Sequence, residues 1–416
     1  ALPVIEIPEI HFNKVAPLFS NLPEAKQTVD IQPMEQFNQG WGTILYRTTL
    51  PEATLAGTVL KITEVHDWAQ IYADGKLLAR LDRRKGEFTT TLPALKKGTQ
   101  LDILVEAMGR VNFDKSIHDR KGITEKVELV SGNQTKVLKN WTVYNFPVDY
   151  SFIKDKKYND TKILPAMPAY YKSTFKLDKV GDTFLDMSTW GKGMVWVNGH
   201  AMGRFWEIGP QQTLFMPGCW LKEGENEILV LDLKGPAKAS IKGLKKPILD
   251  VLREKAPETH RKDGEKLKLA GEKVIHEGAF TPGNGWQEVR FTAPAKGRYF
   301  CLEALSPQAN DNIAAVAEFD VLGADGKPVS REHWKIRYAD SEETRSGNRT
   351  ADKIFDLQES TFWMTVDNVP YPHQLVIDLS KVETVTGFRY LPRAEKEYPG
   401  MIKEYRVYVK SADFNY

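Results

Sequence analysis

The sequence lacks several features that define common classes of protein. Its two cysteines, Cys219 and Cys301, have no neighbours at metal-ligand spacing, so we expect buried free thiols and no disulfide. No apolar run approaches the roughly 20 residues that span a bilayer, which excludes a membrane-spanning helix. The 57 basic residues nearly balance the 55 acidic ones and are spread along the chain. Without a basic patch or a glycine-rich phosphate loop, a nucleic-acid role has little support.

Two kinds of catalytic machinery are also missing. No eightfold alternation of strand and helix patterns occurs, which excludes a TIM barrel from this chain. The run His66-Asp67-Trp68 suggests a catalytic triad, but no G-x-S-x-G nucleophile motif accompanies it. We therefore interpret these residues as a buried polar pair that supports a strand.

The sequence does contain an internal repeat. Ala73-Asp74-Gly75 corresponds to Val197-Asn198-Gly199, and Arg80 corresponds to Arg204, at an offset of about 125 residues that the flanking motifs "LKKG"/"LKEG" and "ILV" share. Asx-Gly dipeptides favour the type I′ turn of a β-hairpin. Because turn signals recur along each copy, we predict two β-sandwiches. The paired arginines indicate a repeated structural ion pair or hydrogen-bonded fork.

Composition sets the boundaries between the segments of the chain. The start is rich in proline, a charged stretch without aromatic residues follows the second repeat, and alternating apolar strands resume after it. We predict an all-β fold with three β-sandwich (jelly-roll) domains. The expected segments are an extended connector at 1–33, jelly rolls at 34–150 and 151–252, a charged linker at 253–273 and a third sandwich at 274–416.

Four long motifs carry a family resemblance: "MEQFNQGWGTILYRT", "HDWAQIYADGKLLARLDRRKGE", "LDILVEAMGRVNFDKSIHDRKGI" and the run from Trp190 to Leu233. From residue 30 to 250 the chain resembles the post-barrel region of glycoside hydrolase family 35 β-galactosidases. In that family a TIM barrel holds the two catalytic Glu residues, and two galactose-binding-like jelly rolls follow it. The resemblance therefore implies that this chain has no catalytic residue of its own.

The third sandwich resembles a discoidin-type (coagulation factor C-type) domain whose parts are reordered. The closing motifs of such domains, here "GRYFCLEAL" and "AVAEFDVLG", precede the opening motif "FDLQESTFW" (Phe355 to Trp363) and the Y-x-P-R motif (Tyr390 to Arg393). This order predicts a circular permutation, which folds tolerate when their termini lie close together.

Two groups of residues are candidates for contact with sugar. The loop Gly109–Gly122 is long, polar and carries an aromatic residue. In the resembled enzymes it lies near the barrel mouth, which implies that Asn112 and Phe113 border the substrate groove. Aromatic planes also stack on pyranose rings, but we favour core packing for four tryptophans, Trp190, Trp196, Trp206 and Trp220.

The discoidin resemblance implies a structural Ca²⁺ held by hard oxygen ligands. The matching residues are Asp356, Thr361 and Glu318, although Leu357 replaces the glycine that follows the aspartate in that family. Ligand loops of such domains combine an aromatic residue with Arg, Asn or His. The corresponding set is Tyr371, His373 and Arg393, with packing as the alternative role.

We expect the chain to be the non-catalytic C-terminal region of a β-galactosidase, in contact with the catalytic barrel and with carbohydrate, and without a required cofactor. The alternative is an independent carbohydrate-binding or adhesion protein made of three galactose-binding-like modules. The family implies a secreted or periplasmic protein, although the start "ALPVIEIPEI" shows no signal peptide.

Overall fold

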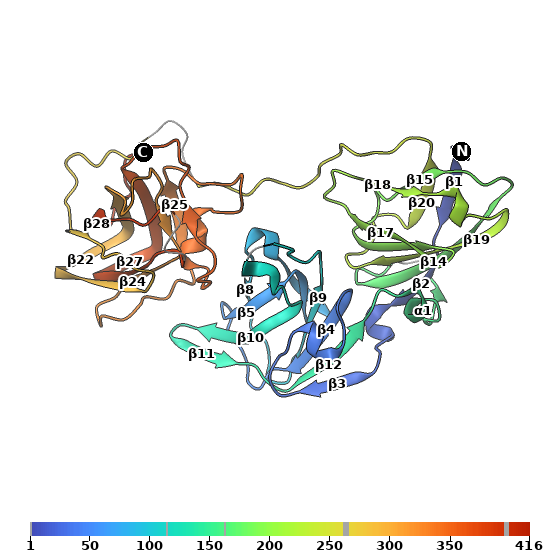
Figure 1. Cartoon of the computed structure of the whole chain (residues 1–416). Helices are drawn as coiled ribbons and strands as arrows, with labels where there is room; N and C mark the ends of the chain where they lie inside the picture. The colour runs from blue at the N-terminus through green and yellow to red at the C-terminus, as the bar shows by residue number, and fades with distance from the viewer. Residues whose placement is uncertain (1, 114, 162–163, 261–265, 395–398) are drawn as a thin grey trace. The chain divides into compact units, whose positions relative to one another are not determined.

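The computed structural model describes residues 2–113, 115–161, 164–260, 266–394 and 399–416. Strands dominate it, as Figure 1 shows, so the predicted all-β class is confirmed. The one α-helix among the described residues is α1 (Tyr150–Ile153). Short 3₁₀ helices occur at η1 (Leu18–Ser20), η2 (Met34–Phe37), η3 (Arg83–Lys85), η4 (Lys115–Ile117), η5 (Gly218–Trp220) and η6 (Ala351–Phe355).

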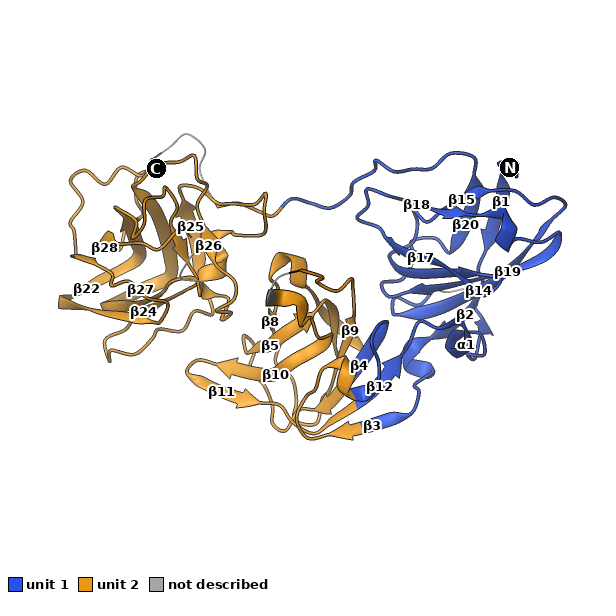
Figure 2. Ribbon diagram, viewed as in Figure 1, with its two compact units in different colours: residues 1–26, 37–45, 143–256 blue, residues 27–36, 46–142, 257–416 orange. Residues whose placement is uncertain are grey.

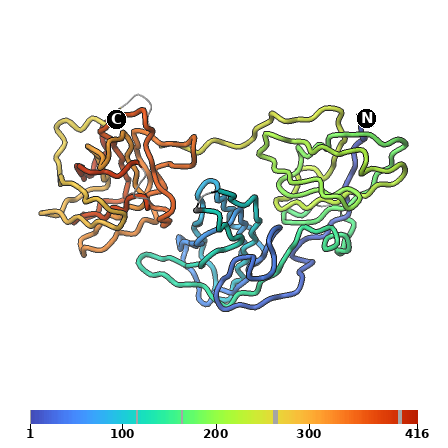
Figure 3. Tube along the Cα trace, in the orientation of Figure 1, coloured from blue at the N-terminus to red at the C-terminus, as the bar shows by residue number. Residues whose placement is uncertain are grey.

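The chain forms two compact units, coloured separately in Figure 2. The first contains residues 1–26, 37–45 and 143–256, and the second contains residues 27–36, 46–142 and 257–416. After residue 142 the chain returns to the first unit, and Figure 3 traces the chain from the N-terminus in blue to the C-terminus in red. The second predicted jelly roll, at 151–252, therefore lies in the same unit as the N-terminal residues.

The first sandwich has two antiparallel sheets. One has the order β3 (Ala25–Thr28), β12 (Trp141–Phe146), β4 (Thr43–Thr49), β9 (Gln100–Glu106), β6 (Trp68–Ala73) and β7 (Lys76–Asp82). The other has the order β11 (Gln134–Val137), β10 (Gly122–Ser131), β5 (Val59–His66) and β8 (Thr89–Thr91). Fully buried side chains from both sheets, such as Ile62 and Ile103, form the core.

The second sandwich repeats this strand order. One sheet runs β13 (Asn159–Asp160), β2 (Lys14–Pro17), β14 (Ala169–Leu177), β19 (Gly224–Asp232), β16 (Lys192–Val197) and β17 (His200–Trp206). The other runs β1 (Ile7–His11), β20 (Ser240–Leu244), β15 (Thr183–Asp186) and β18 (Thr213–Met216). The order β14-β19-β16-β17 matches β4-β9-β6-β7, so the internal repeat is a repeat of topology.

The hairpins of the two copies agree in detail. Asp74 and Gly75 have φ angles of 46° and 79°, and Asn198 and Gly199 have φ angles of 48° and 84°, as a type I′ turn requires. The strand after each turn carries one extra residue, Leu78 in β7 and Met202 in β17, and shifts the register by one. The turn and the bulge are thus one unit that both copies keep.

The N-terminal segment is more ordered than the connector expected at 1–33. Its strands β1 and β2 pair with β20 and β14 of the second sandwich, and Ile7, Ile10 and Val15 are buried in the core of that sandwich. The prolines that suggested a connector are compatible with strands here, because Pro8 lies on an edge strand and Pro17 ends its strand.

The third sandwich is built around two long strands, β22 (Gln287–Ala304) and β27 (His373–Leu391). Its main sheet has the order β21 (His276–Ala279), β28 (Glu404–Lys410), β22, β27 and β24 (Glu318–Leu322), and β25 (Lys335–Ala339) also pairs with β27. A small sheet joins β23 (Ala315–Val316) to β26 (Trp363–Met364). The closing motifs thus supply strands that pair directly with those that follow the opening motif.

The linker 253–273 has neither helix nor strand in its described parts, 253–260 and 266–273. Leu267 is nevertheless buried in a cluster with Cys301, Tyr338 and Tyr408 of the third sandwich. The end of the linker therefore packs on that sandwich.

Candidate functional site at the base of loop 109–122

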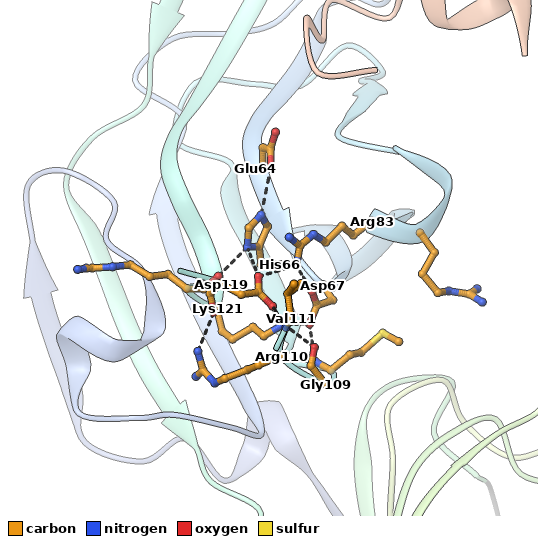
Figure 4. Close-up of polar contacts among 12 residues, drawn as sticks. Glu64, His66, Asp67, Arg83, Gly109, Arg110, Val111, Asp119 and Lys121 are labelled. Carbon is orange, nitrogen blue, oxygen red and sulfur yellow. Dashed lines mark hydrogen bonds and ion pairs between the residues drawn. The ribbon is translucent and has the colours of Figure 1, made fainter. Parts of the chain in front are cut away.

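The loop Gly109–Gly122 rests on a cluster of buried charged side chains in the first sandwich (Figure 4). Asp67 lies at the junction between β5 and β6, Arg83 begins η3, and Asp119 and Lys121 lie just before β10. Strand pairing between β5 and β10 brings these segments together, since Gly122 is opposite His66. The cluster thus joins the end of the loop to two strands of the sandwich.

Two cations bridge two carboxylates in this cluster. Lys121 Nζ lies 2.6 Å from Asp67 Oδ2 and 2.8 Å from Asp119 Oδ2. Arg83 Nη1 lies 2.7 Å from Asp67 Oδ1 and 2.7 Å from Asp119 Oδ1. The side chains of Lys121 and Asp119 are fully buried. Each carboxylate is therefore compensated twice, which buried charges need because their desolvation is costly.

The electrostatics of Asp119 reflect these contacts. Burial by itself raises the pKa of this carboxyl group, but hydrogen bonds from Lys121 and Arg83 and from the Val111 N–H outweigh burial, and the pKa lies well below its usual range. Asp119 is consequently an anion at neutral pH. A permanently charged and doubly paired carboxylate suits positioning better than proton transfer.

The cluster also fixes the backbone at the start of the loop. The bonds run from Met108 N–H to Asp67 (2.6 Å), from Lys121 Nζ to the Gly109 carbonyl (3.0 Å) and from Val111 N–H to Asp119 (3.0 Å). Arg110 Nη1 donates to the Asp119 carbonyl (2.7 Å) and pairs with Glu35 at 2.7 Å. Both ends of the loop are thereby tied to the same buried charges.

Gly122 closes the loop for steric reasons. Its φ is 84°, and a Cβ atom would lie 2.3 Å from the Tyr46 hydroxyl oxygen. That hydroxyl donates to the Gln32 carbonyl at 2.8 Å. A larger residue is therefore disfavoured both by backbone conformation and by contact.

His66 extends the cluster toward β5. Its Nδ1 lies 2.6 Å from the Arg120 carbonyl oxygen and 3.2 Å from Asp119 Oδ1, and its Nε2 lies 3.1 Å from Glu64 Oε2. The hydrogen bond with His66 outweighs desolvation and lowers the pKa of Glu64. His66 and Asp67 are both buried, as the sequence interpretation of a supporting polar pair requires.

The tip of the loop has the opposite character. Asn112 is exposed, and Phe113 and Ile117 are 80% and 58% exposed. A rigid base thus displays apolar side chains to the outside. The sequence analysis selected this loop, but it did not identify Arg83, Asp119 and Lys121 as the residues that support it. The charged run "HDRK" at 118–121 was a signal for two of them, Asp119 and Lys121.

The four tryptophans divide into two pairs. Trp190 and Trp196 are fully buried, and Trp190 meets Tyr171 edge to face at 5.1 Å between ring centroids. Trp206 lies under the Lys192 ammonium at 4.2 Å, and Trp220 stacks on His200 at 4.7 Å with an interplanar angle of 9°. Core packing therefore holds for the first pair. The second pair is partly exposed, although Trp220 also packs against the core of the second sandwich.

The repeated arginines lie on exposed strand positions. Arg80 Nε donates to Gln70 Oε1 at 2.9 Å across the β6–β7 hairpin, which is the hydrogen-bonded kind of contact expected. Arg204 occupies the corresponding place on β17, opposite Met194.

The residues predicted as a ligand set in the third sandwich are mostly internal. His373 is fully buried, with Nδ1 at 2.8 Å from Asp340 Oδ2 and Nε2 at 2.6 Å from the Asn312 carbonyl oxygen. Tyr371 meets His373 at 4.5 Å, and burial raises the pKa of its hydroxyl. Arg393 is separately packed, with its guanidinium 4.2 Å from the Phe362 ring centroid. These contacts favour the packing alternative.

The three residues predicted as calcium ligands do come together. Thr361 Oγ1 donates to Asp356 Oδ2 at 2.7 Å, and the Gln358 N–H bonds to Asp356 Oδ1 and to Glu318 Oε1, both at 3.0 Å. Leu357 has a φ of 64°, so the left-handed turn persists without glycine. Arg331 forms an ion pair with Glu318 within the same group.

Comparison with known families agrees with the resemblance drawn from the motifs. Residues 32–148 match the model "Beta-galactosidase, first all-beta domain", residues 168–226 match "Beta-galactosidase, galactose-binding domain", and residues 338–416 match "F5/8 type C domain". The chain therefore contains the non-catalytic domains of β-galactosidase-related proteins and a discoidin-type domain.

The curated relatives reported next are named β-galactosidase or β-galactosidase-like. The chain is 33% identical over 206 residues to human "Beta-galactosidase-1-like protein 2", covering 48% of this chain and 31% of the relative. It is 34% identical over 255 residues to bovine "Beta-galactosidase", covering 54% and 37%. The chain spans about a third of the length of the curated relatives that it matches.

Similarity to solved structures is weak. An α-L-rhamnosidase from Streptomyces avermitilis, solved with L-rhamnose, covers 92% of this chain and is covered over 46% of its own length, with 10% identity and a TM-score of 0.21. Values this low carry no functional argument. Among the described residues, no helix is long and apolar enough to cross a membrane.

Proposed function

We propose that this chain is the C-terminal, non-catalytic region of an enzyme that hydrolyses terminal β-galactosides. Its sandwiches support the catalytic barrel of the parent protein, and the tip of loop 109–122 borders the substrate groove of that barrel. As the family resemblance implies, the parent protein is secreted or periplasmic. The support for this proposal is the match of two successive segments to β-galactosidase domains.

One structural observation carries the role of the loop. Its base is fixed by the buried pairs of Lys121 and Arg83 with Asp67 and Asp119, whereas Phe113 at its tip is 80% exposed. Three of these four charged side chains are buried and Arg83 is partly exposed, and burying a charge is costly unless it is paired. A rigid base with an exposed aromatic tip is the arrangement that precise positioning of an aromatic side chain requires.

The experiment compares Phe113→Ala with Phe215→Ala in the full-length parent, whose upstream coding sequence must first be read. Phe215 is the matched control, because it is 51% exposed on the second sandwich. We expect Phe113→Ala to lower kcat/KM for β-galactosides by about tenfold without changing the melting temperature. Equal kcat/KM for both variants, or an upstream sequence without βα repeats, would contradict the proposal.

A second candidate function is that of an independent carbohydrate-binding protein. The flat stack of Trp220 on His200 lies at the surface within the segment that matches the galactose-binding domain, and such planes suit a pyranose face. Titration of the chain alone with galactose-terminated oligosaccharides tests it. Binding that Trp220→Ala abolishes would favour this candidate, and absence of binding would exclude it.

A further inference from the structure

Arg331 is a buried cation in the third sandwich. Its side chain is 12% exposed, and it forms an ion pair with Glu318, whose side chain is 2% exposed. Its Nε and Nη2 atoms donate to Asp320 Oδ1 at 2.9 Å and 2.6 Å. One guanidinium therefore bridges two carboxylates that project from the same strand, β24.

The carboxylate oxygens of the predicted calcium ligands are all engaged by donors of the protein, among them the hydroxyl of the third ligand, Thr361. The Glu318 carboxylate accepts from Arg331 Nη1 and from the Gln358 N–H. The Asp356 carboxylate accepts from the same N–H and from the Thr361 hydroxyl. Calcium requires six to eight oxygen ligands within about 2.6 Å. This donor set does not fit the ion, because binding it would displace the hydrogen bonds to Glu318 and Asp356.

The position of Arg331 explains how the fold manages without the ion. Glu318 lies on β24, whereas Asp356 and Thr361 lie in the segment after η6. The Gln358 N–H contacts both carboxyl groups, so Glu318 and Asp356 meet at one point, and their charges repel each other unless cations are near. Lys353 acts on Asp356, and the Arg331 guanidinium pairs with Glu318. The guanidinium remains protonated at every accessible pH and matches carboxylates with its planar fork.

We infer that Arg331 is a built-in cation that replaces a structural metal ion, so that the third sandwich folds independently of calcium. Leu357 agrees with this inference, because the left-handed turn is retained although the glycine of a tight ligand turn is absent. The predicted calcium ligands then keep their hydrogen bonds, and the positive charge beside Glu318 is covalently part of the chain.

The first test uses the unmodified 416-residue chain. We expect the same melting temperature in excess calcium and in excess EDTA. A rise with calcium that disappears in Thr361→Val would overturn the inference, because Thr361 would then be a ligand. A rise that persists in Thr361→Val places the ion elsewhere in the chain and supports the inference.

The second test removes the charge with Arg331→Met, which keeps the length of the side chain. We expect the melting temperature to fall on the order of 10 °C, because the buried Glu318 loses its cation, whereas Asp320 keeps Arg389 at 3.4 Å. Arg298→Met is the matched control, since Arg298 pairs with Asp378 in the same sandwich but is 41% exposed. Equal melting temperatures for Arg331→Met and the control would overturn the inference.

A partial recovery of Arg331→Met in excess calcium, without recovery of Arg298→Met, would support the replacement directly. If Arg331→Met gives no soluble chain, Arg331→Lys decides the question. A soluble, cooperatively melting Arg331→Lys chain supports the inference because Lys keeps the charge. Failure of both variants would overturn it, because a specific shape and not a cation would then be needed.

Discussion

Lys121 and Asp119 lie two positions apart in the sequence and form an ion pair of 2.8 Å in which both side chains are fully buried. The pair is stable because Asp67 and Arg83 complete it on either side. Short-range contacts of this kind usually contribute little at a surface. Burial gives this one a structural role, since it holds the loop that displays Phe113.

The first prediction concerns this pair. Lys121→Met leaves Asp67 and Asp119 with one cation between them, and we expect it to lower the free energy of unfolding by about 3 to 5 kcal/mol. Lys139→Met is the control, because Lys139 pairs with Asp30 at 2.8 Å but both side chains are more than half exposed; its cost should stay below about 1 kcal/mol. Urea denaturation measures both values. Similar costs for the two variants would show that the cluster is not structurally important.

The second prediction is that the chain on its own does not hydrolyse aryl β-galactosides, because the resembled enzymes carry both catalytic carboxylates on the barrel. The "NE" dipeptide at Asn226–Glu227 is the one place that resembles their acid/base motif. In the structure, Glu227 accepts from the Tyr150 hydroxyl at 2.7 Å and pairs with Lys172 at 3.3 Å. Turnover by the chain that Glu227→Gln abolishes would refute this prediction.

The third prediction is a pH dependence of the linker. His260 Nδ1 lies 3.0 Å from Glu342 Oε1, and the hydrogen bond with Glu342, aided by the charges of Asp352 and Glu258, raises the pKa of His260. A raised folded-state pKa contributes stability that is complete below the unfolded value of about 6.5 and is lost as the pH rises through the folded value. Attachment of residues 257–260 to the third sandwich should therefore be firmer at mildly acidic pH.

Hydrogen exchange of this segment measures that attachment. Protection at residues 257–260 should fall from mildly acidic to mildly alkaline pH in the unmodified chain, after correction for the intrinsic exchange rate. His260→Gln keeps a donor but does not titrate, so its corrected protection should stay flat. A parallel fall in both chains would assign the pH dependence to another group.

Local patterns predicted the parts of the fold that depend on local chemistry. Asp74-Gly75 and Asn198-Gly199 indicated two hairpins, because only a few residue types accept positive φ, and the common offset of their surroundings revealed the repeat. The strands β1 and β2 were missed for the opposite reason. Their apolar residues, such as Ile7 and Val15, are buried only through pairing with strands far along the chain, which no local pattern records.

The candidate site was also predicted only where local sequence determines it. The composition of loop 109–122 indicated a functional segment, but its support joins Asp67 to Lys121 across 54 positions. The resemblance grouped Glu318, Asp356 and Thr361, which lie side by side in the structure. It did not predict Arg331, because the acidic partners of an arginine are evident only from the folded chain.

The last prediction concerns the reordered sandwich. In its main sheet, β22 lies between β28 and β27, and β24 pairs with the other edge of β27. A fragment of residues 340–416 keeps β27 and β28 but loses the strand that joins them, together with the core residues Phe300 and Phe319. Its long strands would expose unpaired edges and an open apolar face, so we expect aggregation and no cooperative melting.

The fragment 266–416 retains β22, β24 and the buried Leu267, and it should be soluble and melt cooperatively. Size-exclusion chromatography and thermal melts compare the two. A monomeric, cooperatively melting 340–416 fragment would show that the closing strands are dispensable and that the sandwich is not permuted.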